Sequence, residues 1–90
     1  MPSQAERQND LEAAHERCIK NRDEILASDS CGCFYCLAVF GPCEIQSWVT
    51  EKDGERTALC PKCRVDSVIG SKSGFPIERE FLKRMQRHWF

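Results

Sequence analysis

The sequence predicts a small α+β domain, and three observations support that fold class. The chain has 90 residues, a usual length for one domain. Seven residues are cysteines, close to the content at which cysteine chemistry contributes to a scaffold. Apolar residues recur with helical spacing near both ends, whereas the middle combines turn signals with strand-favouring residues. We expect residues 1–90 to form one domain, with an N-terminal helix in 1–28, a cysteine-containing module at 31–70 and a C-terminal helix in 75–90.

The first segment predicts one long helix from about Gln4 to Ala27. Ser3 and Glu6 have the S-x-x-E spacing of a capping box, in which each side chain satisfies a backbone donor at the helix start. The apolar residues at helical spacing are Leu11, Ala14, Cys18, Ile25 and Leu26. The sequence Ser28-Asp29-Ser30 is expected to end this helix.

The middle of the chain predicts short elements joined by turns. Residues 42–49 follow a Gly-Pro turn signal and favour a short helix, although their β-branched and aromatic residues also fit a strand. The Asp-Gly pair in 52–55 predicts a hairpin turn, and 56–59 a strand after it. The spacing of apolar residues in 65–69 predicts another short helix, ended by Gly70 in the left-handed conformation.

The C-terminal segment predicts the clearest amphipathic helix. Residues 71–74 form a loop of small residues, and Pro76 then opens the helix. Its apolar face consists of Ile77, Phe81, Leu82, Met85 and Trp89. For the domain as a whole, the predicted core residues are Phe34, Phe40, Trp48, Leu59, Val68, Ile69, Phe81, Leu82 and Met85.

Two pairs of cysteines share one spacing, Cys33-x-x-Cys36 and Cys60-x-x-Cys63. Two intervening residues let the chain curl so that both sulfurs of a pair point at one ion, and four thiolates in tetrahedral geometry select zinc. The segment between the pairs, 37–59, is slightly longer than the roughly 15–20 residues common in such sites, which adds little loop-closure entropy. The sequence therefore predicts one structural Zn²⁺ ion bound by these four cysteines.

The other three cysteines fit this site less well. Cys31 is separated from Cys33 by Gly32 alone, so it matches the repeated unit poorly and is expected to be a spare thiol, a neighbour of the site or a small core residue. Cys18 and Cys43 have the same interpretations, because non-ligand cysteines are more often small buried hydrophobes than reactive groups. Gly32 is expected to supply unusual backbone angles at the entry to the first pair.

These elements indicate a zinc finger of one of two kinds. A hairpin precedes the second cysteine pair and a short helix is predicted after it, an order that suits a treble-clef-like finger. A zinc-ribbon-like finger is the alternative, and it would have a second hairpin after Cys63. The N- and C-terminal helices are expected to flank the finger.

Composition also bears on compartment and on membranes. The start MPSQAERQND lacks the basic stretch and apolar run of a secretory signal, and no apolar run approaches the roughly 18 residues of a membrane span. The chain is therefore expected to be cytoplasmic, without membrane contact, where thiols stay reduced and are free to bind metal. An odd number of cysteines also leaves one unpaired in any full set of disulfides.

Nothing in the sequence indicates catalysis or a small-molecule substrate. Catalytic zinc needs an open coordination position, which four cysteine ligands do not leave. The two histidines, His15 and His88, lack motif support as a general base, and no βαβ pattern surrounds either CxxC pair as a thioredoxin-like role would require. We therefore expect a protein that is not an enzyme.

Charge is distributed unevenly along the chain. Residues 1–59 carry six Lys/Arg and eleven Asp/Glu, a net charge of −5, and residues 60–90 carry seven and three, a net charge of +4, which together give −1. Such asymmetry fits either an acidic segment lying against a basic one or a basic face for nucleic acid. The basic residues of the second alternative are Lys62, Arg64, Lys72, Arg79, Lys83, Arg84 and Arg87, with Tyr35, Phe75 and Trp89 available to stack on bases.

Five stretches form a distinctive series: CGCFYC, FGPCEIQSW, TALCPKC, DSVIG and PIEREFLKRMQRHWF. With this series the chain resembles a family of small, uncharacterised bacterial cytoplasmic proteins with two cysteine knuckles, over residues 21–90. The resemblance implies zinc and a cytoplasmic location, and says little about activity. Arg64 departs from the family pattern, which would have glycine after the second knuckle.

Two function classes remain after these observations. The preferred function is a non-enzymatic zinc-stabilised module that binds a protein partner, and the alternative is a nucleic-acid-binding finger.

Overall fold

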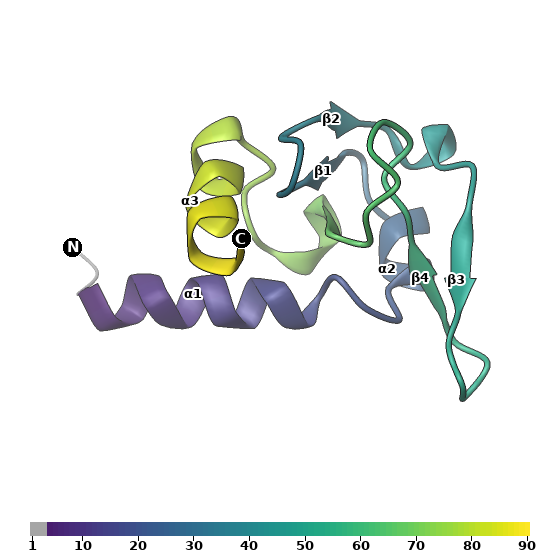
Figure 1. The fold of residues 1–90 in the computed structure, drawn as a ribbon, viewed down its shortest axis with the longest axis horizontal. Helices are drawn as coiled ribbons and strands as arrows, with labels where there is room; N and C mark the ends of the chain where they lie inside the picture. Colours follow the sequence, from purple (N-terminus) through teal and green to yellow (C-terminus); the bar gives the residue numbers. More distant parts are fainter. Residues whose placement is uncertain (1–3) are drawn as a thin grey trace.

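The computed structural model describes residues 4–90, with side chains from Asp10 onward, and confirms the small α+β fold class. The helices are α1 (Gln4–Glu16), α2 (Arg22–Leu26) and α3 (Arg79–Trp89). The strands are β1 (Cys31–Cys33), β2 (Val39–Phe40), β3 (Trp48–Thr50), β4 (Arg56–Ala58) and β5 (Val68–Gly70). Two 3₁₀ turns, Pro42–Glu44 and Ser71–Ser73, complete the fold. Figure 1 shows α3 standing across α1 at one end of the molecule and the β3–β4 hairpin at the other end.

The strands form two antiparallel sheets. The first has the order β2-β1-β5, with Cys31 opposite both Phe40 and Gly70 and with Cys33 opposite Val68. The second consists of β3 and β4, with Thr50 opposite Arg56. The predicted turn at 52–55 and the strand after it are confirmed by this hairpin.

The three-stranded sheet separates two apolar clusters because successive residues of a strand face opposite sides. One cluster lies against α1 and α3 and contains Leu11, Ala14, Cys18, Phe34, Ile69, Phe81, Leu82 and Met85. The other lies on the cysteine side and contains Ile25, Cys31, Cys33, Phe40, Ala58, Cys60 and Val68. Seven of the nine predicted core residues belong to these clusters. The other two, Trp48 and Leu59, are half-buried.

Gly32 is required by close packing. A Cβ at this position would lie 2.8 Å from Leu82 Cδ1 and 3.2 Å from Ile77 Cγ2. Its φ angle is not in the left-handed region, so the expectation of unusual backbone angles at Gly32 is wrong. The absent side chain instead lets the segment around α3 approach β1.

The substitution Gly32→Ala is expected to lower the free energy of unfolding by about 1–3 kcal/mol, because the added methyl group overpacks the buried Leu82 side chain. Gly41→Ala is the matched control, since a Cβ there has its nearest neighbour at 3.8 Å and the φ angle is −83°. Urea denaturation of both zinc-loaded variants measures the difference. Equal midpoints would contradict the packing argument.

The single long helix predicted for Gln4–Ala27 is wrong, because the chain breaks between α1 and α2. Lys20 adopts a left-handed conformation with φ of 53°, and its backbone N–H donates to Thr57 Oγ1 at 2.8 Å. The Asn21 side chain is buried between strands. These contacts with residues far along the chain outweigh the local helical preference. The capping box at Ser3 and Glu6 lies outside the residues whose side chains the structure describes.

Two further short helices were predicted wrongly or in part. Residues 65–69 lead into β5, and Gly70 has φ of −108° where a left-handed cap was predicted. In residues 42–49 the predicted helix is limited to a 3₁₀ turn at the start. The strand alternative is confirmed at Trp48–Thr50. The C-terminal helix is confirmed, although α3 begins at Arg79, three residues after Pro76.

Candidate metal centre

The structure brings the four predicted ligands together. The sulfur atoms of Cys33, Cys36, Cys60 and Cys63 all lie within 4.8 Å of one another. The Cys33–Cys63 and Cys36–Cys60 sulfur pairs are each 3.6 Å apart. A regular tetrahedron with Zn–S bonds of about 2.3 Å has edges of roughly 3.8 Å. The arrangement therefore fits one tetrahedral metal ion held by four thiolates.

Strand pairing positions the two halves of this site. Cys33 ends β1 and pairs with Val68 at the start of β5, while Cys60 follows β4 closely. Cys33 and Cys60 are fully buried, Cys63 is half-buried and Cys36 is exposed. The centre thus lies at the edge of the second apolar cluster, with one side toward solvent.

We call Cys33–Cys36 the first knuckle and Cys60–Cys63 the second knuckle. The first knuckle has a regular set of backbone hydrogen bonds. The Tyr35 N–H donates to Cys33 Sγ at 3.4 Å and the Leu37 N–H donates to the Cys33 carbonyl at 2.9 Å. The Cys33 N–H in turn donates to the Ala38 carbonyl at 3.0 Å. Three hydrogen bonds donated by backbone N–H groups therefore fix the turn around Cys33.

The second knuckle repeats this set at the same offsets. The Lys62 N–H donates to Cys60 Sγ at 3.3 Å and the Arg64 N–H donates to the Cys60 carbonyl at 3.0 Å. The Cys60 N–H donates to the Val65 carbonyl at 3.0 Å. The two cysteine pairs therefore share one backbone geometry, as the two halves of a single metal site would.

The residue after each knuckle has a left-handed backbone. Leu37 has φ of 67° and Arg64 has φ of 68°. This conformation costs an L-residue about 1–2 kcal/mol, and glycine adopts it freely. Arg64 therefore adopts, at an energetic cost, a backbone conformation that glycine would adopt freely.

Arg64→Gly is expected to stabilise the zinc-loaded protein by about 1 kcal/mol, because it removes this backbone strain. Lys62→Gly is the matched control within the same knuckle, where φ is not positive, and it should be neutral or destabilising. Thermal unfolding followed by circular dichroism would measure both. A lower melting temperature for Arg64→Gly than for the parent would contradict the expectation.

A buried hydroxyl supports one of the ligands. Ser67 Oγ lies 3.1 Å from Cys33 Sγ, and Ser67 is 2% exposed. The same residue accepts the Phe34 N–H through its carbonyl at 3.0 Å. When Cys33 is ionised, the Ser67 hydroxyl donates to the thiolate and fixes its orientation, as outer hydrogen bonds commonly do in metal sites.

Three of the four thiols have shifted pKa values. Burial raises the pKa of the Cys36 and Cys63 thiols, and neighbouring sulfurs add to the effect. At Cys60 burial also opposes ionisation, but hydrogen bonds from the backbone N–H groups of Cys63 and Lys62 hold its pKa below the usual value. A bound cation would offset the raised pKa of the Cys36 and Cys63 thiols.

The remaining cysteines lie outside the cluster. Cys31 is fully buried in the second apolar cluster, and burial raises its pKa to about 11. Cys18 is 8% exposed in the first cluster, and burial raises its pKa to about 11 as well, with a smaller contribution from Asp66. Both are small core residues, one of the roles considered for them. Cys43 lies exposed on the 3₁₀ turn before β3.

Each of the two cysteine pairs leads into a strand of the three-stranded sheet. The first knuckle connects β1 to β2 within one hairpin, and the second follows the β3–β4 hairpin. The segment after Cys63 leads to β5, which pairs with β1 and not with β4. The short helix that favoured the treble-clef form is therefore replaced by a strand that joins the two halves of the site.

The basic residues predicted for nucleic acid are all exposed, but they are spread over several elements. Lys62 and Arg64 flank Cys63, and Lys72 lies on the second 3₁₀ turn. The other four lie on α3: Arg79, Lys83, Arg84 and Arg87. Of the predicted stacking residues, Phe75 is half-buried and stacks on Phe81 at 5.8 Å between ring centroids, so it is not free to stack on a base.

Three exposed aromatic residues lie at the first cysteine pair and at the end of α3; Tyr35 and Trp89 were predicted as stacking residues, and Phe90 was not. We call Tyr35, Trp89 and Phe90 the aromatic surface, and their exposed fractions are 46%, 37% and 59%. The Phe90 ring lies 4.9 Å from the Tyr35 ring, and Trp89 stacks on His15 at 3.9 Å. Contacts from α1 and from the knuckle therefore hold this surface in place. The apolar face predicted for the C-terminal helix did not include Phe90, because this residue follows the end of α3.

Comparison with known proteins gave no relatives: no family model, no curated protein and no solved structure matches this chain. The resemblance based on the CGCFYC and DSVIG motifs stays a prediction. Among the helices of residues 4–90, none is long and apolar enough to cross a membrane. The four-cysteine cluster is thus the feature on which a functional assignment rests.

Proposed function

We propose that this chain is a non-enzymatic, zinc-stabilised module of the cytoplasm that binds another protein. The cluster of four sulfurs carries the proposal, because four cysteine ligands complete a tetrahedral zinc site. A closed site of this kind has no position for a substrate or an activated water molecule. A reducing compartment fits the same chemistry, since the ligands must be thiolates.

The aromatic surface supports a protein partner. Aromatic residues are enriched in protein interfaces and often dominate the binding energy. Tyr35, Trp89 and Phe90 are all exposed, with Phe90 packed against Tyr35 and Trp89 stacked on His15. The chain also has a net charge of −1, and four thiolates around one Zn²⁺ add a formal charge of about −2. This balance disfavours a polyanionic partner.

Affinity capture with paired variants tests this proposal. The zinc-loaded protein and the variant Tyr35→Ser/Phe90→Ser are used as baits in nuclease-treated cytoplasm, with Val39→Ser/Val49→Ser as a control that removes exposed apolar residues from strands. We expect one partner that binds the parent and the control saturably once purified, and binds the aromatic variant at least about tenfold more weakly. Equal binding by all three baits would contradict the assigned surface.

Nucleic acid is the second candidate, and the exposure of Tyr35 and Trp89 together with the exposed lysine and arginine residues of α3 favours it. Exposed aromatic rings beside cations are the usual components of single-strand binding. Fluorescence anisotropy with mixed oligonucleotides should then show salt-sensitive binding that Arg84→Glu/Arg87→Glu abolishes. Absence of binding at about 50 mM salt would exclude this candidate.

A further inference from the structure

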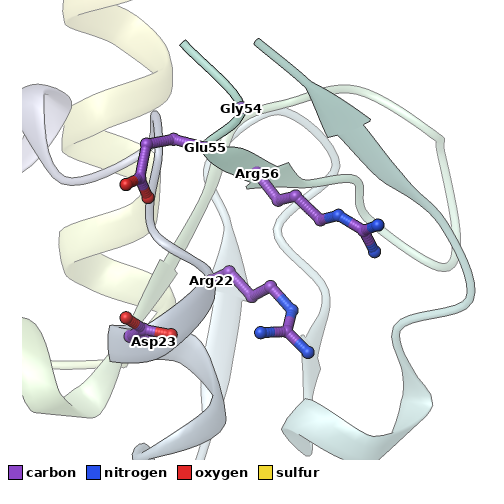
Figure 2. A pocket seen from close by; sticks show the side chains of 5 residues that line it. All are labelled: Arg22, Asp23, Gly54, Glu55 and Arg56. Atoms are coloured by element: carbon purple, nitrogen blue, oxygen red, sulfur yellow. The ribbon is translucent and has the colours of Figure 1, made fainter.

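A second candidate site lies away from the metal centre, between the start of α2 and the β3–β4 hairpin. Here the chain forms an open pocket of about 320 Å³. Its lining residues are Arg22, Asp23, Gly54, Glu55 and Arg56 (Figure 2). Neither the metal centre nor the aromatic surface shares any of these residues.

The charges around this pocket are segregated. Figure 2 shows the guanidinium groups of Arg22 and Arg56 pointing to one side, and the carboxylates of Asp23 and Glu55 pointing to the other. Among residues 10–90, the ion pairs join Arg17 to Glu24 and Lys20 to Asp53, so neither pocket arginine takes part in one. Two guanidinium groups that form no ion pair with residues 10–90 therefore line one opening.

The backbone under the two arginines is fixed. Lys20 lies two residues before Arg22, and its backbone N–H donates to Thr57 Oγ1 at 2.8 Å. The next residue, Asn21, accepts the Ala58 N–H through its side chain at 3.1 Å, and Asn21 is 3% exposed. These bonds tie the two residues just before Arg22 to the two residues just after Arg56. With the backbone fixed, only the two arginine side chains remain to be ordered when a ligand binds.

We propose that Arg22 and Arg56 form a binding site for a phosphate monoester group. Two guanidinium groups supply a charge of +2, and a phosphate monoester carries about −1.5 to −2 at neutral pH. The planar fork of arginine matches phosphate oxygens with two parallel hydrogen bonds. An opening between an exposed turn and a short helix admits a small group or a modified side chain.

The surroundings of the pocket favour a single dianion over a nucleic-acid backbone. Acidic side chains flank the arginine pair on α2 and on the hairpin: Asp23, Glu24, Glu51, Asp53 and Glu55. A long polyanion would approach several of these carboxylates, and each approach would be repulsive. A compact group can contact the two guanidinium groups on the side away from the Asp23 and Glu55 carboxylates, which line the same pocket.

Titration with inorganic phosphate, followed by ¹⁵N NMR at constant ionic strength, tests the site directly on the zinc-loaded chain. We expect saturable shifts confined to the amides of Arg22, Gly54, Glu55 and Arg56, with no such shifts from chloride. Arg22→Gln and Arg56→Gln should each weaken binding at least about tenfold. Lys72→Gln is the matched control, because Lys72 is exposed and lies outside the pocket, and it should bind as the parent does.

Two further probes separate the sources of the phosphate group. Saturable binding of a phosphoserine peptide but not of its serine counterpart would support a phosphorylated partner. Binding of inorganic phosphate without the peptide would support a small phosphate ester. Shifts that persist in both arginine variants, shifts that do not saturate, or tighter binding of a single-stranded oligonucleotide at these residues would overturn the proposal. Preserved amide dispersion and zinc content in each variant show that folding is unaffected.

Discussion

Removal of zinc with a chelator is expected to unfold the protein. The free energy with which zinc binds a folded four-ligand site is about 10–16 kcal/mol at pH 7, whereas a small domain has a total stability of about 5–15 kcal/mol. In this chain the ligands come from two segments that meet only in the folded state, and Cys33 and Cys60 are themselves part of the second apolar cluster. Loss of the ion therefore leaves buried thiols crowded together without a cation. Circular dichroism before and after addition of chelator measures the transition.

Single cysteine variants separate the ligands from their neighbours. Cys33→Ser and Cys60→Ser are each expected to lose the ion and the fold, because a serine hydroxyl cannot replace a thiolate ligand. Cys31→Ser is the control, since Cys31 is as deeply buried as Cys33 and lies two residues before it on β1. It should keep one zinc ion per chain and lose only about 1–3 kcal/mol, the cost of a buried hydroxyl.

Elemental analysis of the purified variants gives the metal content. A parent chain that folds fully in the presence of chelator would remove the basis for a structural zinc site. Loss of zinc in Cys31→Ser with retention in Cys33→Ser would mean that the first knuckle uses a different pair of sulfurs.

The candidate metal centre could be predicted from sequence because its ligand pairs are defined by spacing within short segments. Two residues between paired cysteines determine whether both sulfurs reach one ion, and that spacing is visible without a structure. The repeated hydrogen bonds of the two knuckles follow from the same local turn. Only the left-handed backbone at Leu37 and Arg64 was hidden, because neither residue type prefers it.

The helices were predicted less well where distant contacts decide. Residues 65–69 satisfy the i, i+3, i+4 pattern, but Val68 and Ile69 face opposite sides of a sheet, and each joins a different apolar cluster. A short apolar run fits helix and strand equally in sequence. The choice is made by pairing with β1, a partner more than thirty residues away.

The pocket between α2 and the hairpin depends on the same kind of distant contact. Arg22 interrupted the apolar pattern of the predicted long helix, and nothing local related it to Arg56. The break between α1 and α2 redirects the chain, so that both arginines line one opening. One side chain at that break, Asn21, forms hydrogen bonds with both β4 and β5.

Asn21→Ala is expected to destabilise the protein by about 2–4 kcal/mol, a large effect for a single polar side chain. The Asn21 amide donates to the Val68 carbonyl at 2.9 Å and to the Arg17 carbonyl at 3.0 Å, and it accepts the Ala58 N–H at 3.1 Å. It thereby joins β4 to β5, which belong to different sheets. Removal leaves buried backbone groups without partners, at about 1–3 kcal/mol each. Urea denaturation of the zinc-loaded variant measures the loss.

Two companion variants separate hydrogen bonding from lost volume. Asn21→Asp keeps the shape and the acceptor for the Ala58 N–H, but its carboxylate faces the Val68 carbonyl without a proton to donate, so we expect it to be at least as destabilised as Asn21→Ala. Gln46→Ala removes an exposed amide and should change stability by no more than about 0.5 kcal/mol. In both Asn21 variants the Ala58 amide should exchange its hydrogen faster, because its acceptor is lost or weakened by the opening of the two sheets. Unchanged exchange at Ala58, with stability equal to that of Gln46→Ala, would show that the two sheets are joined by their apolar packing and not by Asn21.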